Sequence, residues 1–276
     1  MNVWIGTAGY SYSNWVGPFY PPGTRTTGML GHYARHFPVV ELNFTFYRCP
    51  TPAMLTRLAG QSPPGFRFAV KLPRSLSHER RLDDLFAFRE AAQALHARKR
   101  LAELVCQLPQ SSHNDPATRS WLERLARELR GLPLGVEFRH VSWARREVAP
   151  WLRTHRLDLI AVDVPDVPAL YPRGPAWSGK RFYARLHSRN AGNWYGEGGI
   201  RYDYGYGDEE LREWVAGLRA AAATCEEAYL VFNNCKTTQA VDNARRMGEL
   251  LRSEAPELRV MPPFAAVPSA QGSLFE

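Results

Sequence analysis

Eight short apolar runs, each ending on a polar side chain, constrain the fold of this chain more than any other feature. Strands that are buried on both faces of a parallel sheet read as continuous apolar runs. Helix-like segments separate the runs, and a closed β/α barrel with eight such repeats typically needs about 250 residues. The chain of 276 residues therefore predicts a single (β/α)8 barrel of the TIM type. The runs end at Thr7, Asn43, Lys71, Gln107, Arg139, Asp163, His187 and Asn233.

Signals for the connections agree with this prediction. Thr51-Pro52 and Asp115-Pro116 each place an N-cap residue before a proline at the first helical position. The link Pro165–Lys180 is rich in proline and glycine, so we expect an irregular connection without a full helix between the sixth and seventh strands. Apolar periodicity is lost after residue 261. We therefore expect a barrel over residues 1–261 and a mobile C-terminal tail over residues 262–276.

Composition indicates which cellular compartment and which kinds of partner fit the protein. The net charge of +8 fits either solvated arginine-rich helix faces or a surface that attracts phosphate-bearing partners. The four cysteines show no paired spacing, which favours a reducing compartment over a disulfide framework. No apolar stretch is long enough to span a membrane, and no signal segment precedes the first run. These features predict a cytoplasmic protein without a membrane partner.

The polar ends of the runs predict a site at the barrel mouth. Side chains alternate faces along a strand, so counting in twos from each polar end gives an inward set. In barrels of this type, the chemistry sits at the C-terminal ends of the strands. The expected inward set is Thr7, Glu41, Asn43, Lys71, Gln107, Glu137, Arg139, Asp163, Arg185, His187 and Asn233.

The residue types in this set suggest two kinds of role. As catalytic candidates we take the groups suited to acid–base chemistry, which are Glu41, Glu137, Asp163 and His187. The cations Lys71, Arg139 and Arg185 are candidates for holding an anion, and the amides Asn43, Gln107 and Asn233 for orienting it. A single pair such as Glu137 with Arg185 can also be purely structural. Lys236, in a loop that leads into a helix after the eighth strand, is a further candidate for binding phosphate.

A metal centre is the less favoured interpretation. Glu41, Glu137, Asp163 and His187 could supply oxygen and nitrogen ligands to a divalent ion. The three cations of the same set compete for those carboxylates, and no local ligand pair of the HExxH kind is present. We therefore expect no cofactor and no metal ligands, with a divalent metal as the open alternative.

Ordered motifs along nearly the whole chain resemble those of the YecE-like family, known as domain of unknown function 72. They include IGTAGYSYSNWVGPFYP, FRFAVKLPRSLSH, GVEFRHVSW, ARLH and YLVFNN. The resemblance implies a β/α barrel and no established reaction. It adds Tyr47, Trp143 and Asn234 to the candidates for substrate binding, and His78 to the recurrent polar positions. Ser188 and Cys235-Lys236-Thr237 depart from the family pattern, which frequently has glycine at these places.

Three functions remain open from the sequence. The first is an acid–base enzyme, such as a hydrolase or lyase, that acts on a phosphate-bearing or nucleic-acid-derived substrate. The second is a non-catalytic nucleic-acid-binding protein, and the third is a carbohydrate-processing barrel that uses two carboxylates. Two loops rich in aromatic residues, 10–23 and 188–207, could stack on a ligand ring or simply fill the barrel mouth.

The end of the chain carries one further motif. Gln271, Leu274 and Phe275 fit the Gln-x-x-Leu-Phe pattern of peptides that bind bacterial sliding clamps. Leucine and phenylalanine would anchor in an apolar pocket while glutamine sets the register. We therefore expect the sliding clamp as a candidate partner, and an apolar tail end without a partner is the alternative.

Overall fold

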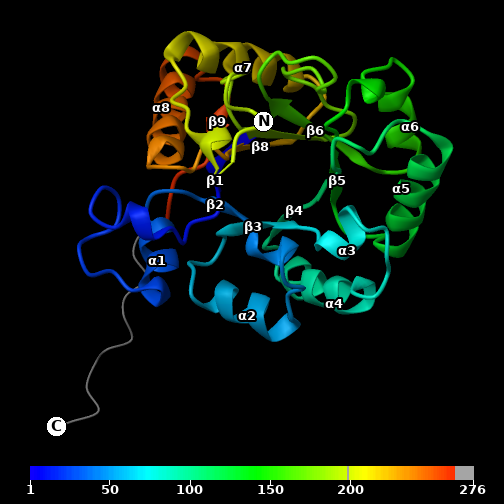
Figure 1. Ribbon diagram of the computed structural model, residues 1–276. Helices are drawn as coiled ribbons and strands as arrows, with labels where there is room; N and C mark the ends of the chain where they lie inside the picture. Colours follow the sequence, from blue (N-terminus) through cyan, green and yellow to red (C-terminus); the bar gives the residue numbers. More distant parts are fainter. Residues whose placement is uncertain (198, 265–276) are drawn as a thin grey trace.

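The structure is a computed structural model, which describes residues 1–197 and 199–264. Parallel strands form an inner ring, and the helices lie around it (Figure 1). The strands are β1 (Asn2–Ala8), β2 (Val39–Leu42), β3 (Arg67–Lys71), β4 (Leu101–Gln107), β5 (Leu134–Glu137), β6 (Asp158–Asp163), β7 (Arg181–Leu186), β8 (Glu227–Phe232) and β9 (Arg259–Val260). The helices are α1 (Thr26–Tyr33), α2 (Pro52–Gly60), α3 (Arg74–Ser77), α4 (Leu85–His96), α5 (Pro116–Glu128), α6 (Val148–Thr154), α7 (Asp208–Ala221) and α8 (Gln239–Glu254). The predicted (β/α)8 barrel is confirmed.

The barrel closes through β1, which pairs with β8 along its length and with β2 only at its last three residues, Gly6–Ala8. On the side that faces β2, the first two residues of β1, Asn2 and Val3, pair with β9 instead. This ninth strand was not predicted, because two residues are too few to show a strand pattern.

The predicted helix caps and the irregular link between β6 and β7 are present in the structure. The Thr51 hydroxyl accepts a hydrogen bond from the Met54 amide at 3.2 Å, and the Asp115 carboxylate accepts one from the Thr118 amide at 2.7 Å. Both side chains thus cap their helices as expected. Residues 164–180, all described by the structure, contain no helix, so the irregular link between β6 and β7 is confirmed.

The inward faces of the strands follow the prediction in six strands and not in two. On β1 the residue inside the barrel is Ala8, while Thr7 faces α1 and bonds the Tyr33 hydroxyl. On β6 Ile160 lies inside the barrel, so Asp163 lies on the opposite face. The assignment of Thr7 and Asp163 to the inward set is therefore wrong. Both β1 and β6 have apolar residues on both faces. The last polar residue of each strand therefore does not indicate which face lies inside the barrel.

The chain stays attached to the barrel somewhat beyond the predicted boundary at residue 261. The Met261 amide donates to the Val3 carbonyl oxygen at 2.8 Å, and the Phe264 amide to the Ala34 carbonyl oxygen at 3.2 Å. The predicted clamp motif at Gln271, Leu274 and Phe275 lies outside the described residues and stays a prediction from the sequence. Within the described residues, the helices are all too short or too polar to cross a membrane.

Candidate functional site

A cavity of about 620 Å³ opens at the C-terminal ends of the strands. Its polar lining includes most of the residues predicted from the strand ends, and its walls are largely aromatic. The polar lining contains Glu41, Asn43, Lys71, Gln107, Arg139, Arg185, Asn233 and Lys236. The aromatic walls contain Tyr10, Tyr12, Phe44, Phe46, Tyr47 and Tyr202. The volume suits a small ligand that carries both a ring and polar groups.

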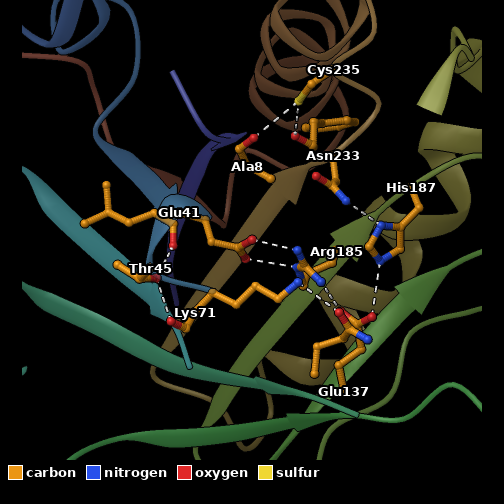
Figure 2. A network of polar contacts seen from close by, with 12 residues as sticks. Ala8, Glu41, Thr45, Lys71, Glu137, Arg185, His187, Asn233 and Cys235 are labelled. Carbon is orange, nitrogen blue, oxygen red and sulfur yellow. Dashed lines mark hydrogen bonds and ion pairs between the residues drawn. The ribbon is translucent and has the colours of Figure 1, made fainter. Parts of the chain in front are cut away.

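A chain of ion pairs crosses the floor of this cavity, as Figure 2 shows for Glu41, Arg185 and Glu137. Arg185 binds Glu41 through two nitrogens, at 2.7 and 3.0 Å, and also bonds one oxygen of Glu137. The other oxygen of Glu137 accepts a hydrogen bond from Arg139. The Tyr183 hydroxyl adds a bond to Glu41 at 2.9 Å. Glu41, Glu137 and Arg185 are fully buried, and burial is tolerated because each charge is paired.

These contacts fix the charge states of Glu137 and Arg185. Burial alone would raise the pKa of Glu137, but the nearby Arg139 and Arg185 outweigh it and hold the pKa well below the usual range. Burial opposes the charge on Arg185, yet Glu137 and Glu41 raise its pKa well above the ordinary value. Glu137 is consequently a permanent anion at physiological pH, and it has no proton to donate.

Lys71 differs from the two arginines. Its ammonium donates to the Gln107 side-chain oxygen at 2.9 Å and lies 4.4 Å from the centre of the Phe46 ring. Within the part of the chain that the structure describes, no carboxylate forms an ion pair with it. Burial and the charge of Arg185 lower the pKa of Lys71 to about 8, although Glu137 and Glu41 act in the opposite direction. Lys71 is thus the cluster member poised to titrate near physiological pH.

Counting charges shows what the cluster can hold. Two carboxylates, Glu41 and Glu137, face three cations, Lys71, Arg139 and Arg185. Two negative charges against three positive ones leave one excess positive charge beside the cavity. Such a site attracts a ligand that carries at least one negative charge.

His187 is a neutral member of the cluster. It is fully buried, with one ring nitrogen 2.8 Å from the Asn233 amide nitrogen and the other 3.2 Å from Arg139 and 3.5 Å from Glu137. Burial, followed by the charge of Arg139, lowers the pKa of His187 to about 3. The imidazole is therefore uncharged at physiological pH, and its one acceptor nitrogen can take a hydrogen bond from Asn233 or from Arg139, but not from both.

Asp163 lies outside this cluster. Its carboxylate accepts hydrogen bonds from Trp214 on α7 at 2.7 Å and from Arg189 at 2.8 and 2.9 Å. Arg189 in turn binds Glu213 of α7. Asp163 thus joins β6 to α7 and to the loop after β7, and the prediction that it converges with the catalytic candidates is wrong.

Two other predicted binding residues also lie away from the cavity. Trp143, in the 3-10 turn Val141–Trp143, stacks on Phe138 at 4.2 Å and donates to the Ser112 carbonyl oxygen. Asn234 is buried and bonds the Tyr204 carbonyl oxygen and the Asn243 side chain. Both shape the loops around the mouth and do not face a ligand.

The rim residues are placed as the sequence suggested. Tyr47 lines the cavity with 86% of its surface exposed, and is free to cover a ligand. Lys236 also lines the cavity, and its ammonium lies 3.4 Å from Asp203. That salt bridge leaves Lys236 less available to an anion than Lys71.

Sequence reasoning missed the aromatic turn Phe44–Phe46, which directly follows β2. Thr45 fixes this turn, because its hydroxyl bonds the carbonyl oxygens of Leu42 and Lys71 at 2.8 and 2.6 Å. The bonds hold Phe44 and Phe46 on the cavity wall, the latter against Lys71. The signal was available in the run FTFY after a strand end, which is the usual place for ligand-binding residues in such barrels.

The residues considered for a metal do not form a ligand set. Among residues 1–197 and 199–264, no three His, Cys, Asp or Glu side chains are grouped closely enough to hold an ion. Glu41 and Glu137 direct their oxygens at Arg185, and Asp163 faces α7.

Comparison with known proteins identifies the family. The family model described as "Protein of unknown function DUF72" matches residues 4–268. The chain belongs to the DUF72 family. A solved DUF72 protein from Thermotoga maritima has a TM-score of 0.84 and 34% identity, covering 91% of this chain and all of that one. A DUF72 protein from Enterococcus faecalis, with a TM-score of 0.80 and 21% identity over 91% of this chain and 95% of its own, shares the fold.

Two curated DUF72 relatives carry names without an activity. The UPF0759 protein YunF of Bacillus subtilis is 25% identical, covering 91% of this chain and 95% of its own length. The UPF0759 protein YecE of Escherichia coli is 33% identical over 146 residues, about half of each chain. Membership in the DUF72 family therefore establishes the barrel, while the reaction must be argued from the cavity.

The two departures noted from the sequence differ in exposure: Ser188 and Cys235 are buried, while Lys236 and Thr237 are exposed. The Ser188 hydroxyl accepts a hydrogen bond from the Asn190 amide at 2.9 Å, which shapes the loop after β7. Cys235 lines the cavity, and its thiol contacts the carbonyl oxygens of Ala8 and Phe232 at 3.5 Å each (Figure 2). Burial raises the pKa of the Cys235 thiol to about 12, so it forms part of the wall and not a nucleophile.

Proposed function

We propose that the barrel mouth is an enzyme active site that binds a small phosphate-bearing substrate and acts on it by acid–base chemistry. The observation that carries the proposal is the excess positive charge beside the cavity, with the unpaired ammonium of Lys71 facing it. An anion in this position would complete the charge balance of the cluster. Aromatic walls would hold the ring of a nucleotide or a sugar phosphate.

The residues divide into two roles in this proposal. Glu41 and Glu137 hold Arg185 and Arg139 with their guanidinium groups beside the cavity, so they are positioning residues. Lys71 is the group that exchanges a proton with the substrate, because its pKa of about 8 allows both states near neutral pH. This replaces the earlier expectation that the carboxylates and His187 carry the acid–base step.

The alternatives receive less support. A glycoside-processing mechanism needs one carboxylic acid that keeps its proton near neutral pH. Glu137 stays ionised, and Glu41 accepts three hydrogen bonds from Arg185 and Tyr183. A non-catalytic nucleic-acid-binding role would use the same cations and aromatic residues, but a cavity of about 620 Å³ suits a single nucleotide better than a duplex.

The test is calorimetric titration with inorganic phosphate, sugar phosphates, mononucleotides and short oligonucleotides, followed by assays for turnover of each ligand that binds. Lys71→Gln should weaken phosphate binding about tenfold or more, because it removes the unpaired charge. Lys180, an exposed lysine just before the start of β7, gives the matched control. Lys180→Gln should bind phosphate like the wild type.

Each outcome decides between the functions. Binding and turnover of a small phosphate ester support the proposal. Tight binding of oligonucleotides without any turnover supports the non-catalytic alternative. Absence of binding for every phosphate-bearing ligand overturns the proposal.

A further inference from the structure

The amine of Lys71 has a contact pattern that ordinary salt-bridge lysines lack. One side-chain acceptor, Gln107, receives a hydrogen bond from Nζ, and the Phe46 ring covers one side. The Gln107 amide group donates to the Leu108 carbonyl oxygen at 2.8 Å, which fixes the oxygen of Gln107 toward Lys71. Lys71 also lines the cavity, so its side chain borders the space that a ligand would occupy.

We propose that Lys71 is a covalent catalytic residue, and that its amine condenses with the aldehyde or ketone carbonyl of an anionic substrate. The inference rests on the proposed function and names its substrate class, a carbonyl compound that also bears a phosphate or carboxylate group. The nitrogen lone pair adds to the carbonyl carbon, and the C=O π electrons move to oxygen. A proton then passes from this nitrogen to the oxygen and gives a carbinolamine. With a second proton from solvent the oxygen leaves as water, and a protonated C=N double bond to Nζ remains.

The burial of Lys71 favours this chemistry. A lysine is a nucleophile only when it is deprotonated, and a dry pocket promotes that state. Burial is the main cause that lowers the pKa of Lys71 to about 8; Arg185 and Arg139 add to it, while Glu137 and Glu41 oppose it. With this pKa, roughly a tenth of the amine is free near neutral pH. Because the protonated imine keeps one positive charge, the site retains its attraction for the anionic group throughout the reaction.

Other lysines at or near the barrel do not share these features. Lys236 lines the same cavity, but it is paired with Asp203 at the rim. Lys180 is 82% exposed and paired with Glu226. Lys180 is therefore the matched control, since it is an exposed lysine away from the cavity.

The experiment traps the imine by reduction. The full-length protein is incubated with pyridoxal 5′-phosphate, a phosphate-bearing aldehyde, or with pyridoxal, which lacks the phosphate, and is then treated with borohydride. Peptide mass spectrometry should find one main adduct, on Lys71. Labelling by pyridoxal should be at least about tenfold slower, because it lacks the anion. Lys180→Gln should label like the wild type. Adducts spread over surface lysines to the same extent in wild type and Lys71→Gln would overturn the inference.

A second variant separates this inference from the proposed function. Lys71→Arg keeps the positive charge but has no amine that can form an imine. It should bind inorganic phosphate within about threefold of the wild type by calorimetry, and form no adduct. If the wild type binds phosphate but is not trapped with either aldehyde, the imine chemistry is wrong and the proposed function stands. If it binds no phosphate and forms no adduct, both fail.

Discussion

At the scale of single residues, Arg185 controls the charge of the barrel interior. It is the shared partner of Glu41 and Glu137, and all three side chains are buried. A buried ion pair adds little net stability compared with an apolar core, but removing one partner leaves an uncompensated charge. Loss of Arg185 alone should therefore destabilise the protein more than replacement of all three charged residues by apolar ones.

Replacing Arg185 by methionine should destabilise the protein by about 3–5 kcal/mol near pH 8. The loss should be smaller near pH 4.5. In the wild type the pKa of Glu137 is lowered, so its contribution to stability is present above its unfolded-state pKa and is lost as the pH falls. In the variant Glu137 loses one of the two cations that hold its pKa low, so the cost of the substitution grows as the pH rises.

Urea unfolding at the two pH values measures this difference. Arg252→Met, at an exposed position on α8, is the control and should change stability by no more than about 0.5 kcal/mol at either pH. An equal loss at both pH values for Arg185→Met would contradict the assigned charge states.

At the scale of elements, the spacing of polar residues explains which inward faces were predictable. Polar residues stand two positions apart at the C-terminal ends of three strands: Glu41 and Asn43 at β2, Glu137 and Arg139 at β5, and Arg185 and His187 at β7. Polar residues at even spacing share a face, so each pair reports the inside twice. This redundancy made the site cluster predictable from the sequence.

The two failures follow from the same rule. Asn2 and Thr7 on β1, and Asp158 and Asp163 on β6, are separated by an odd number of residues, so they lie on opposite faces. Asp158 bonds Arg181 at the other end of the barrel, while Asp163 turns to α7. The sequence alone could not choose between them, because the partner that holds Asp163 is Trp214, far along the chain.

The substitution Asp163→Asn tests whether Asp163 only connects β6 to α7 or takes part in catalysis. The amide weakens the charge-assisted bonds with Arg189, so we expect a loss of about 2–3 kcal/mol in the free energy of unfolding. Phosphate affinity, measured by calorimetry, should stay within about twofold of the wild type. Lys71→Gln is the complementary control, with weakened binding and unchanged stability. An Asp163→Asn protein of wild-type stability that no longer binds phosphate would restore Asp163 to the active site.

At the scale of the whole molecule, Phe264 links the end of the described chain to the first third of the barrel. Its ring lies 6.4 Å from that of Phe66 and packs on Gly65, where a Cβ atom would approach the ring to 3.0 Å. Gly65 also has a φ of +89°, which glycine adopts without strain. The contact was not predicted, because an isolated aromatic residue in a proline-containing segment shows no periodic pattern.

Phe264→Ala should lower the free energy of unfolding by about 1–2 kcal/mol, less than for a fully buried phenylalanine because the ring is partly exposed. Thermal and urea unfolding measure the effect. Phe86→Ala, at a side chain that is 73% exposed on α4, should change stability by no more than about 0.5 kcal/mol. Equal effects of the two substitutions would show that Phe264 does not fasten the chain to the barrel.

The pairing of β1 has a consequence for biosynthesis. Asn2–Ala8 is synthesised before the other strands of the barrel, yet its long partner strand is Glu227–Phe232, and Arg259–Val260 completes its other side. Local β/α units can begin to order while the nascent chain grows, but contacts between residues so distant in sequence form slowly. The β1–β8 pair that closes the ring must therefore wait until translation has passed residue 232, and the pairing with β9 until it has passed residue 260. Until then the edges of β1 that these strands cover have no strand partner, so closure of the barrel is a late event in synthesis.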